Sequence, residues 1–184
     1  GSGPLGSGMA MDKEVTKRQL QSAGIPTADW GMWPMLPGAI ADLGLPLIVK
    51  PSNGGSTVGL TLVKAPDQLD DAIALALESD RDVMLERFLP GREFTVGILG
   101  QQALAVGEII PQHEIFDYEC KYTPGLTREV FPAEIPDELA REMTRHYVDD
   151  TERLGLGRPD HEPLTSEYVG PIVALIADLV DRGH

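Results

Sequence analysis

Apolar residues recur at helical spacing in three segments of the chain, residues 11–24, 65–80 and 135–155. In the first segment, Gly24 follows the last periodic residue, and glycine there ends helices because it tolerates a left-handed backbone. The second segment carries Asp67 near its start, where a carboxylate suits the helix dipole. Each segment predicts a helix. The residues at helical spacing are Val15, Gln19, Leu20 and Ala23; Leu69, Ala72, Ile73, Ala76 and Leu77; and Leu139, Met143, Tyr147 and Leu154.

Short apolar runs between these segments predict β-strands, because β-branched and aromatic residues favour an extended backbone. The predicted strands cover residues 47–50, 59–64, 82–89, 92–100 and 102–111. The first two enclose a long loop and predict a hairpin. The last two meet at Gly100 and Gln101, like a tight hairpin.

The remaining segments predict less regular structure. The first eight residues are rich in Gly and Ser and indicate either a remnant of an expression tag or a native loop. Residues 25–46 are rich in Pro and Gly and predict a connector. A last helix is predicted over about residues 169–180. Strand pairs with flanking helices, without strict alternation of strand and helix, predict an α+β fold with antiparallel pairing.

The composition narrows the class of protein. With 184 residues, the chain suits one domain or two small lobes that share a cleft. We expect no transmembrane span and no secretory signal, since no run of eighteen apolar residues and no basic segment before an apolar one occurs. A single cysteine fits a reducing compartment. The net charge of -14 argues against a nucleic-acid surface, so any anionic ligand must be held by a few local cations.

The stretch "KPSNGGSTVG" has the residue types that a phosphate group needs. Gly54 and Gly55 allow the backbone N–H groups to approach a ligand closely. Ser56 and Thr57 add hydroxyl donors, and Lys50 supplies a positive charge at the base of the loop.

This loop is not a P-loop. Leu60 and Thr61 stand where that motif requires Lys and Ser or Thr, and Gly59 leads into a strand rather than a helix. A mobile hairpin tip without a ligand remains the alternative interpretation, because glycine-rich turns are common.

The stretch "VMLERFLPGREFTVGIL" places Glu86 and Glu93 at the edges of two predicted strands, with a Pro-Gly turn between them. One carboxylate in such an arrangement can face an adenine amino group and the other a ribose hydroxyl. The alternative is that both are solvated surface acids, the commoner fate of a glutamate.

Four separated blocks, taken in order, resemble one family. They are residues 1–26, 43–59 ("LGLPLIVKPSNGGSTVG"), 85–100 ("LERFLPGREFTVGILG") and 109–122 ("IIPQHEIFDYECKY"). The chain looks like an ATP-grasp ligase and closely resembles the D-alanine–D-alanine ligase family over roughly residues 1–160.

The resemblance implies an ATP-grasp fold, in which two lobes with antiparallel sheets enclose a nucleotide cleft. Residues 1–30 would form a linker and helix, residues 31–106 the small lobe, and residues 107–184 a truncated C-terminal lobe.

The resemblance also implies residues that hold the phosphate groups. Lys13 and Lys50 would contact the ATP phosphates, and Ser56 would lie in the loop that closes over them. Lys121 and Tyr122 match a mobile loop that closes the active site and helps to hold phosphate and substrate.

For the adenosine half of ATP, the resemblance implies that Glu86, Arg87 and the backbone through Leu89 border the adenine, while Glu93 meets the ribose. Arg87 stands where the family commonly has lysine. Cys120 occupies a position that is often alanine, so we expect a tolerated small residue and not a nucleophile.

The activity implied is ATP-dependent joining of two D-alanine molecules for peptidoglycan synthesis in the bacterial cytoplasm. ATP would phosphorylate one carboxylate, and the amine of the second D-alanine would attack the acyl phosphate. The cofactors implied are ATP and Mg²⁺ (or Mn²⁺). The expected partners are these small molecules, not nucleic acid or a membrane, and a homodimer is compatible with the resemblance.

The sequence departs from the family pattern towards its end. Arg158 and Asp160 match an arginine that stabilises the intermediate and an aspartate that binds magnesium, but Pro159 between them removes a backbone donor. No Glu-x-Asn pair follows, and we assign no role to Glu162 or Glu167. The resemblance implies that residue 1 would lie after the family's N-terminal α/β domain. We therefore expect weak or absent ligation by this polypeptide alone.

Two other interpretations remain open from the sequence. One is a nucleotide-binding module without ligase turnover, and the other is a chain that has lost ligand binding. His113 is expected to be a strand-edge or loop residue rather than a metal ligand, because no second histidine lies at ligand spacing.

Overall fold

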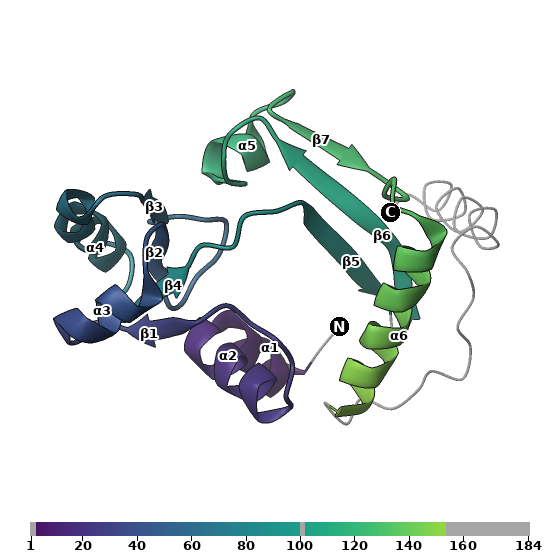
Figure 1. Cartoon of the computed structure of the whole chain (residues 1–184), viewed down its shortest axis with the longest axis horizontal. Helices are drawn as coiled ribbons and strands as arrows, with labels where there is room; N and C mark the ends of the chain where they lie inside the picture. Colours follow the sequence, from purple (N-terminus) through teal and green to yellow (C-terminus); the bar gives the residue numbers. More distant parts are fainter. Residues whose placement is uncertain (1–2, 100–101, 154–184) are drawn as a thin grey trace. The chain divides into compact units, whose positions relative to one another are not determined.

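A computed structural model describes residues 3–99 and 102–153 (Figure 1). The chain forms two compact units, Gly1–Arg92 with Ile110–Arg128, and Glu93–Ile109 with Glu129–His184. The elements are α1 (Pro4–Met11), α2 (Lys13–Ser22), β1 (Trp30–Met32), α3 (Pro37–Leu43), β2 (Leu47–Pro51), β3 (Thr61–Val63), a 3₁₀ turn (Pro66–Gln68), α4 (Leu69–Leu77), β4 (Val83–Arg87), β5 (Glu93–Leu99), β6 (Gln102–Pro111), α5 (Tyr118–Tyr122), β7 (Thr127–Val130) and α6 (Asp137–Arg153).

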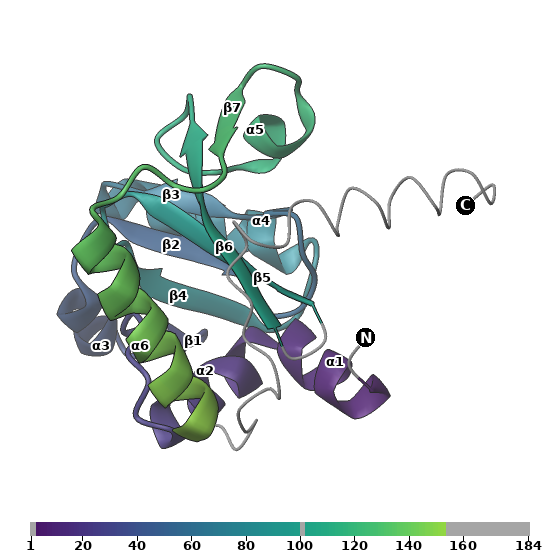
Figure 2. The ribbon, with the colours of Figure 1, turned by 90° about the vertical axis from the view of Figure 1, so that its right-hand side faces the viewer.

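The first unit is built on a four-stranded sheet in the order β1-β4-β2-β3. Figure 2 shows these strands in that order from bottom to top. All three pairings are antiparallel. The predicted hairpin of β2 and β3 is confirmed, with Leu47 opposite Val63. Strand β4 lies between β2 and β1, so that Glu86 stands opposite Ile48 on one side and Trp30 on the other.

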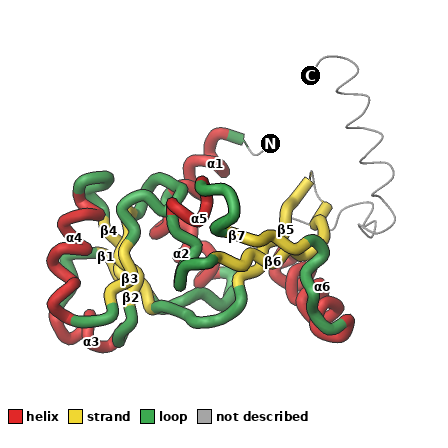
Figure 3. The backbone as a smooth tube through the Cα atoms, turned by 90° about the horizontal axis from the view of Figure 1, so that it is seen from above, coloured by secondary structure: helices red, strands yellow, loops and turns green. Residues whose placement is uncertain are grey.

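The two faces of this sheet differ in chemistry. Helices α3 and α4 lie on one face and α2 on the other (Figure 3). The face towards α3 and α4 holds the apolar core, whose fully buried members include Leu47, Val49, Val63, Val83 and Leu85. Because side chains alternate along a strand, Ile48 and Lys50 of β2 point to the opposite face.

Helix α2 confirms the first predicted helix. The side chain of Asp12 caps it by accepting a hydrogen bond from Val15 N at 3.1 Å, and Gly24 follows its end with a φ of 69°. Pro4–Met11 form helix α1, so the native loop considered for the first residues is wrong. Pro4 starts this helix, where its missing N–H costs nothing.

The Pro- and Gly-rich connector is more regular than predicted. It contains the edge strand β1 and the helix α3, which starts at Pro37 and ends at Gly44 with a φ of 72°. Proline at the start and glycine at the end are boundary signals of a short helix. A three-residue strand and a seven-residue helix are too short to show a hydrophobic period.

The second sheet has three strands in the order β5-β6-β7, and β5 pairs with β6 antiparallel. Leu99 stands opposite Gln102, as predicted for the second hairpin, while its turn lies outside the described residues. Helix α6 confirms the helix predicted over 135–155. The helix predicted over about 169–180 also lies outside the described residues. Two antiparallel sheets with flanking helices confirm the α+β class.

Among the described residues, none of the helices combines the length and the apolar character needed to span a bilayer. The lobe boundaries that the resemblance implies, after residues 30 and 106, stay a prediction.

Candidate functional site

The carboxylate of Glu86 is held between two lysines from different elements of the first unit. Lys17 of α2 places its Nζ 2.5 Å from Glu86 Oε1, and Lys50 of β2 donates to Glu86 Oε2. Less than a fifth of each of the three side chains is exposed, with 8% for Lys17, 18% for Lys50 and 14% for Glu86. One carboxylate thus fixes two cations on the face of the sheet opposite the apolar core.

Lys17 completes its hydrogen bonds inside the protein. Besides Glu86, its Nζ donates to Thr27 Oγ1 and to Ala28 O, each at 2.9 Å. An ammonium group has three protons, so all of them have acceptors. These hydrogen bonds offset the cost of burying the Lys17 side chain, whose residual exposure is 6%.

These neighbours also set the ionisation of Glu86. Burial disfavours the charged carboxylate and acts to raise its pKa, but the charge of Lys50 and the hydrogen bonds from Lys17 and Lys50 outweigh burial. The pKa of Glu86 therefore lies below its usual value. Glu86 is an anion at neutral pH and can accept hydrogen bonds from a ligand.

Lys13, at the first position of α2, brings a further positive charge beside Lys50. Its Nζ donates to Ser52 O at 3.2 Å and to Gly54 O at 3.1 Å. Burial lowers the pKa of Lys13, and the charge of Lys50 lowers it further. The N-terminus of a helix is the positive end of its dipole, so Lys13 adds its charge to a potential that is already positive. This pair of lysines is therefore suited to an anionic ligand.

The loop that follows Lys50 is held by hydrogen bonds at its base and has an unusual backbone conformation at its tip. Asn53 donates from its backbone N and its side-chain Nδ2 to Asp80 Oδ2, at 2.8 and 3.0 Å. Ser56 and Thr57 have positive φ values of 55° and 58°, which non-glycine residues rarely adopt. Such strain at a loop tip often marks a functional segment.

A hydrogen bond joins the tip of this loop to helix α5. The hydroxyls of Ser56 and Tyr122 are in direct contact, although the residues lie far apart in the sequence. Lys121, next to Tyr122, lies over the ring of Phe116 with its Nζ 5.1 Å from the centroid. The structure thus brings together Ser56 and Tyr122, two residues assigned to closure by the resemblance.

The expected adenine neighbours point in different directions. Glu86 faces the two lysines, whereas Arg87 donates from Nη2 to Asp42 O at 3.1 Å and pairs with Asp29 at 3.2 Å. Leu89 is exposed. Of the two charged side chains, Glu86 therefore lies with the lysines, while Arg87 is engaged by Asp42 and Asp29.

The structure leaves three predicted site residues untested. Glu93, the first residue of β5, is exposed in the second unit. Arg158 and Asp160 lie outside the described residues. The roles assigned to all three stay predictions.

Sequence reasoning missed Lys17 altogether. A lysine inside an amphipathic helix is normally solvated, and its burial depends on Glu86, which is distant in sequence. One signal was available: Lys17 lies one helical turn after Lys13 and so shares its side of α2.

Comparisons with known proteins agree with this picture. The model of the family described as D-ala D-ala ligase C-terminus matches residues 19–156. A D-alanine–D-alanine ligase from Synechococcus sp. (strain JA-2-3B'a(2-13)) is 45% identical over 148 residues, which are 77% of this chain and 46% of that protein.

Two solved structures from Bacillus anthracis are also similar. The crystal structure of its D-alanine–D-alanine ligase shares 33% identity and a TM-score of 0.70, over 84% of this chain and 52% of that one. The structure complexed with ATP shares 29% identity and a TM-score of 0.67, over 83% and 49%.

The fold and the matched residues define an ATP-grasp protein. The chain belongs to the D-Ala–D-Ala ligase C-terminal family, and it spans about half the length of the curated relatives that it matches.

Proposed function

We propose that this chain binds Mg²⁺-ATP and takes part in the ATP-dependent ligation of two D-alanine molecules to D-alanyl-D-alanine, via an acyl phosphate, for peptidoglycan synthesis. The observation that carries the proposal is the convergence of Lys13 and Lys50 at the base of the glycine loop. The solved structure of a similar protein in complex with ATP supports the choice of ATP as the ligand. The bacterial cytoplasm, where ATP is available, is the proposed location.

The two lysines are assigned to the phosphate groups. The Nζ of Lys50 keeps donors beyond its bond to Glu86, because an ammonium group carries three protons. Phosphoryl transfer concentrates negative charge between the nucleotide and its acceptor. Fixed cations stabilise that charge without reorganising at the moment of reaction.

Glu86 is assigned two roles. It keeps Lys50 in place, and it accepts a hydrogen bond from the adenine amino group. Each carboxylate oxygen has two acceptor positions, and Lys17 and Lys50 occupy one on each oxygen. One position on each oxygen is therefore open to a ligand.

The glycine loop and helix α5 are assigned to closure over the phosphates. Gly54 and Gly55 leave the backbone N–H groups uncovered, and Ser56 can tie the loop to Tyr122. Excluding water in this way strengthens the interaction of Lys13 and Lys50 with phosphate. Magnesium, when bound, would neutralise phosphate charge, with Asp160 as its proposed ligand.

The alternative is a nucleotide-binding module without ligase turnover. One observation of the sequence favours keeping it: no Glu-x-Asn pair follows Arg158 and Asp160.

Isothermal titration calorimetry with Mg²⁺-ATP tests the nucleotide site. Lys13→Met and Lys50→Met are each expected to weaken binding by roughly 10- to 100-fold, because a hydrogen bond between charged groups contributes about 1.5–3 kcal/mol. Lys64→Met is the matched control, since Lys64 is half exposed and pairs with Glu114 away from the two lysines. Equal affinity in all three variants would disprove the assignment.

Phosphate release separates the two candidate functions. A ligase releases phosphate from ATP only when D-alanine is present, whereas a binding module shows ATP binding without it. Thin-layer or mass-spectrometric detection of D-alanyl-D-alanine then identifies the product.

A further inference from the structure

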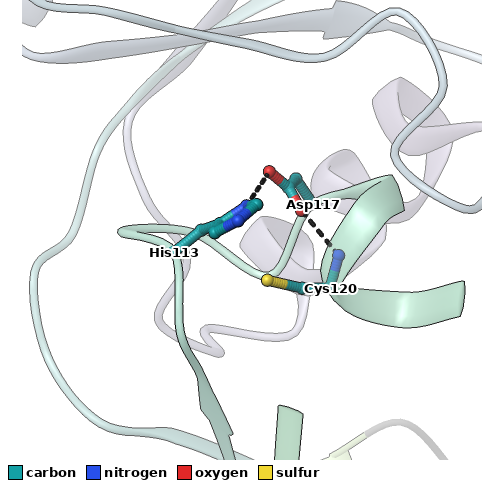
Figure 4. A group of neighbouring side chains, drawn as sticks. All are labelled: His113, Asp117 and Cys120. Carbon is teal, nitrogen blue, oxygen red and sulfur yellow. Dashed lines mark hydrogen bonds and ion pairs between the residues drawn. The ribbon is translucent and has the colours of Figure 1, made fainter. Parts of the chain in front are cut away.

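Three side chains of different chemistry meet in the segment between β6 and α5 of the first unit. The ligand atoms of His113, Asp117 and Cys120 all lie within 4.8 Å of one another (Figure 4). His113 and Asp117 are partly exposed, at 37% and 33% of their side chains, and Cys120 is buried. Among the residues that the structure describes, these side chains form the one group of three or more His, Cys, Asp or Glu residues that could hold a metal ion.

The local backbone holds these side chains together. Asp117 caps α5, and its Oδ1 accepts a hydrogen bond from Cys120 N at 2.8 Å. The cap therefore brings Cys120 onto the same side as the carboxylate. His113, four residues earlier, points its Nδ1 at Asp117 Oδ2, 2.7 Å away.

We propose that His113, Asp117 and Cys120 form a binding site for a divalent cation of the zinc class, with water as the fourth ligand. Thiolate, imidazole and carboxylate are a ligand set that suits Zn²⁺ and Co²⁺, whereas Mg²⁺ prefers oxygen ligands and retains its waters. This site is thus chemically different from the magnesium site proposed for ATP, and it does not depend on the proposed function.

The geometry needs only small movements. Tetrahedral zinc sets its nitrogen, oxygen and sulfur ligands about 3.4–3.6 Å apart, as its bond lengths require. The atoms here span up to 4.8 Å, and the His113–Asp117 hydrogen bond of 2.7 Å must lengthen. A rotation of the partly exposed His113 ring can lengthen that hydrogen bond.

The surroundings supply a second shell that orients two of the ligands. Cys120 N occupies Asp117 Oδ1 and leaves Oδ2 for the metal. Thr127 Oγ1 donates to Cys120 O at 2.7 Å and fixes the backbone that carries the thiol. Bound metal would tether α5, with Lys121 and Tyr122, to the loop after β6.

Co²⁺ titration of the reduced chain tests the site, because a cobalt–thiolate bond gives a near-ultraviolet charge-transfer band and tetrahedral Co²⁺ gives intense visible bands. The wild-type chain is expected to show both. Zn²⁺ should abolish them by displacement, and excess Mg²⁺ should leave them unchanged. Absence of the thiolate band in the wild-type chain would overturn the proposal.

The variants are chosen to keep the fold. Cys120→Ser preserves size, and Asp117→Asn preserves an oxygen that can cap α5. These variants and His113→Ala should each weaken Co²⁺ binding at least about tenfold. His146→Ala, at an exposed histidine of α6, is the control and should bind as the wild type does. Persistence of the thiolate band in His113→Ala would also refute this ligand set.

A measurement on the wild-type chain covers variants that fail to fold. Zn²⁺ should shift the NMR signals of the His113 ring at one equivalent and leave those of His146 unchanged. Equal shifts for both histidines would indicate unspecific binding and contradict the proposal.

Discussion

Lys17 of α2 lies with its Nζ 2.5 Å from Glu86 Oε1 of β4, and this ion pair joins helix α2 to the four-stranded sheet. Lys17 is buried and Glu86 is nearly buried. Removal of one partner therefore leaves the charge of the other in a largely dry place without its full set of opposite charges. The pair therefore contributes to stability as well as to the placement of Lys50.

Replacement of Lys17 by methionine is expected to lower the free energy of unfolding by about 3 kcal/mol, the lower end of the cost of breaking a buried ion pair, since Glu86 keeps Lys50. Urea denaturation measures this loss. The matched control is Arg18→Met, which removes a more exposed pair with Glu14 and should cost less than about 1 kcal/mol. Similar losses in both variants would contradict the structural role of Lys17.

The lowered pKa of Glu86 predicts acid sensitivity. A carboxyl group whose pKa is lower in the folded than in the unfolded state stabilises the fold above its unfolded pKa. This contribution is lost as the pH falls through the folded pKa. The loss thus occurs in the acidic range, below the ordinary pKa of a glutamate.

Glu86→Gln should therefore be less stable than the wild type at pH 7, and the difference should narrow as the pH falls below 4.5. Urea midpoints across this range measure the gap. A gap that stays constant would show that the ionisation of Glu86 is not linked to folding. If the variant does not fold, NMR titration of the Glu86 carboxyl carbon in the wild type gives the direction of the pKa shift.

The sequence predicted the elements that are long or bounded by clear signals. Helix α2 has a cap at Asp12 and a stop at Gly24, and the β2–β3 hairpin follows from two apolar runs around a glycine loop. Elements β1, α3, α5 and β7 were missed. They have between three and seven residues, fewer than a hydrophobic period needs to become visible.

Residue type alone suggested the phosphate loop and the acids near an adenosine, and these roles stay predictions. The structure does bring Lys50 and Glu86 together. The burial of Lys17 and the metal-type cluster at His113 were not predictable, because both depend on contacts that only the folded chain makes. A second histidine at ligand spacing is not needed for such a cluster, because Asp117 and Cys120 also offer ligand atoms beside His113.

The hydrogen bond between Ser56 and Tyr122 predicts a ligand-dependent loop. Tyr122→Phe removes the hydroxyl and keeps the ring, so stability should change little at this exposed position. Affinity for Mg²⁺-ATP should fall about 2- to 12-fold, the equivalent of one hydrogen bond of 0.5–1.5 kcal/mol. Amide hydrogen exchange of residues 53–59 should become faster.

Tyr118→Phe is the matched control, since Tyr118 is exposed on the same helix and its ring lies 4.6 Å from that of Tyr122. It should leave both the affinity and the exchange rates as in the wild type. If Tyr118→Phe and Tyr122→Phe behave alike, the contact with Ser56 has no part in closure.

Two glycines of the same loop separate the needs of folding from those of binding. Gly59 has a φ of 69°, and a Cβ there would lie 3.0 Å from Pro51 Cγ and 3.2 Å from Ser79 Oγ. Alanine at this position is therefore strained in its backbone and crowded in its surroundings. Gly59→Ala should lower the free energy of unfolding by about 1–2 kcal/mol.

Gly55 has open space where a Cβ would stand, and its φ is not in the left-handed region. Gly55→Ala should therefore keep the stability within about 0.5 kcal/mol of the wild type. Its binding is expected to differ, because a methyl group on a loop that closes over phosphate holds the backbone N–H groups away from the anion. We expect Mg²⁺-ATP affinity to fall about tenfold, equivalent to 1.4 kcal/mol. Calorimetry and urea denaturation on both variants give the two quantities, and an unchanged affinity in Gly55→Ala would mean that the loop tip does not approach the triphosphate.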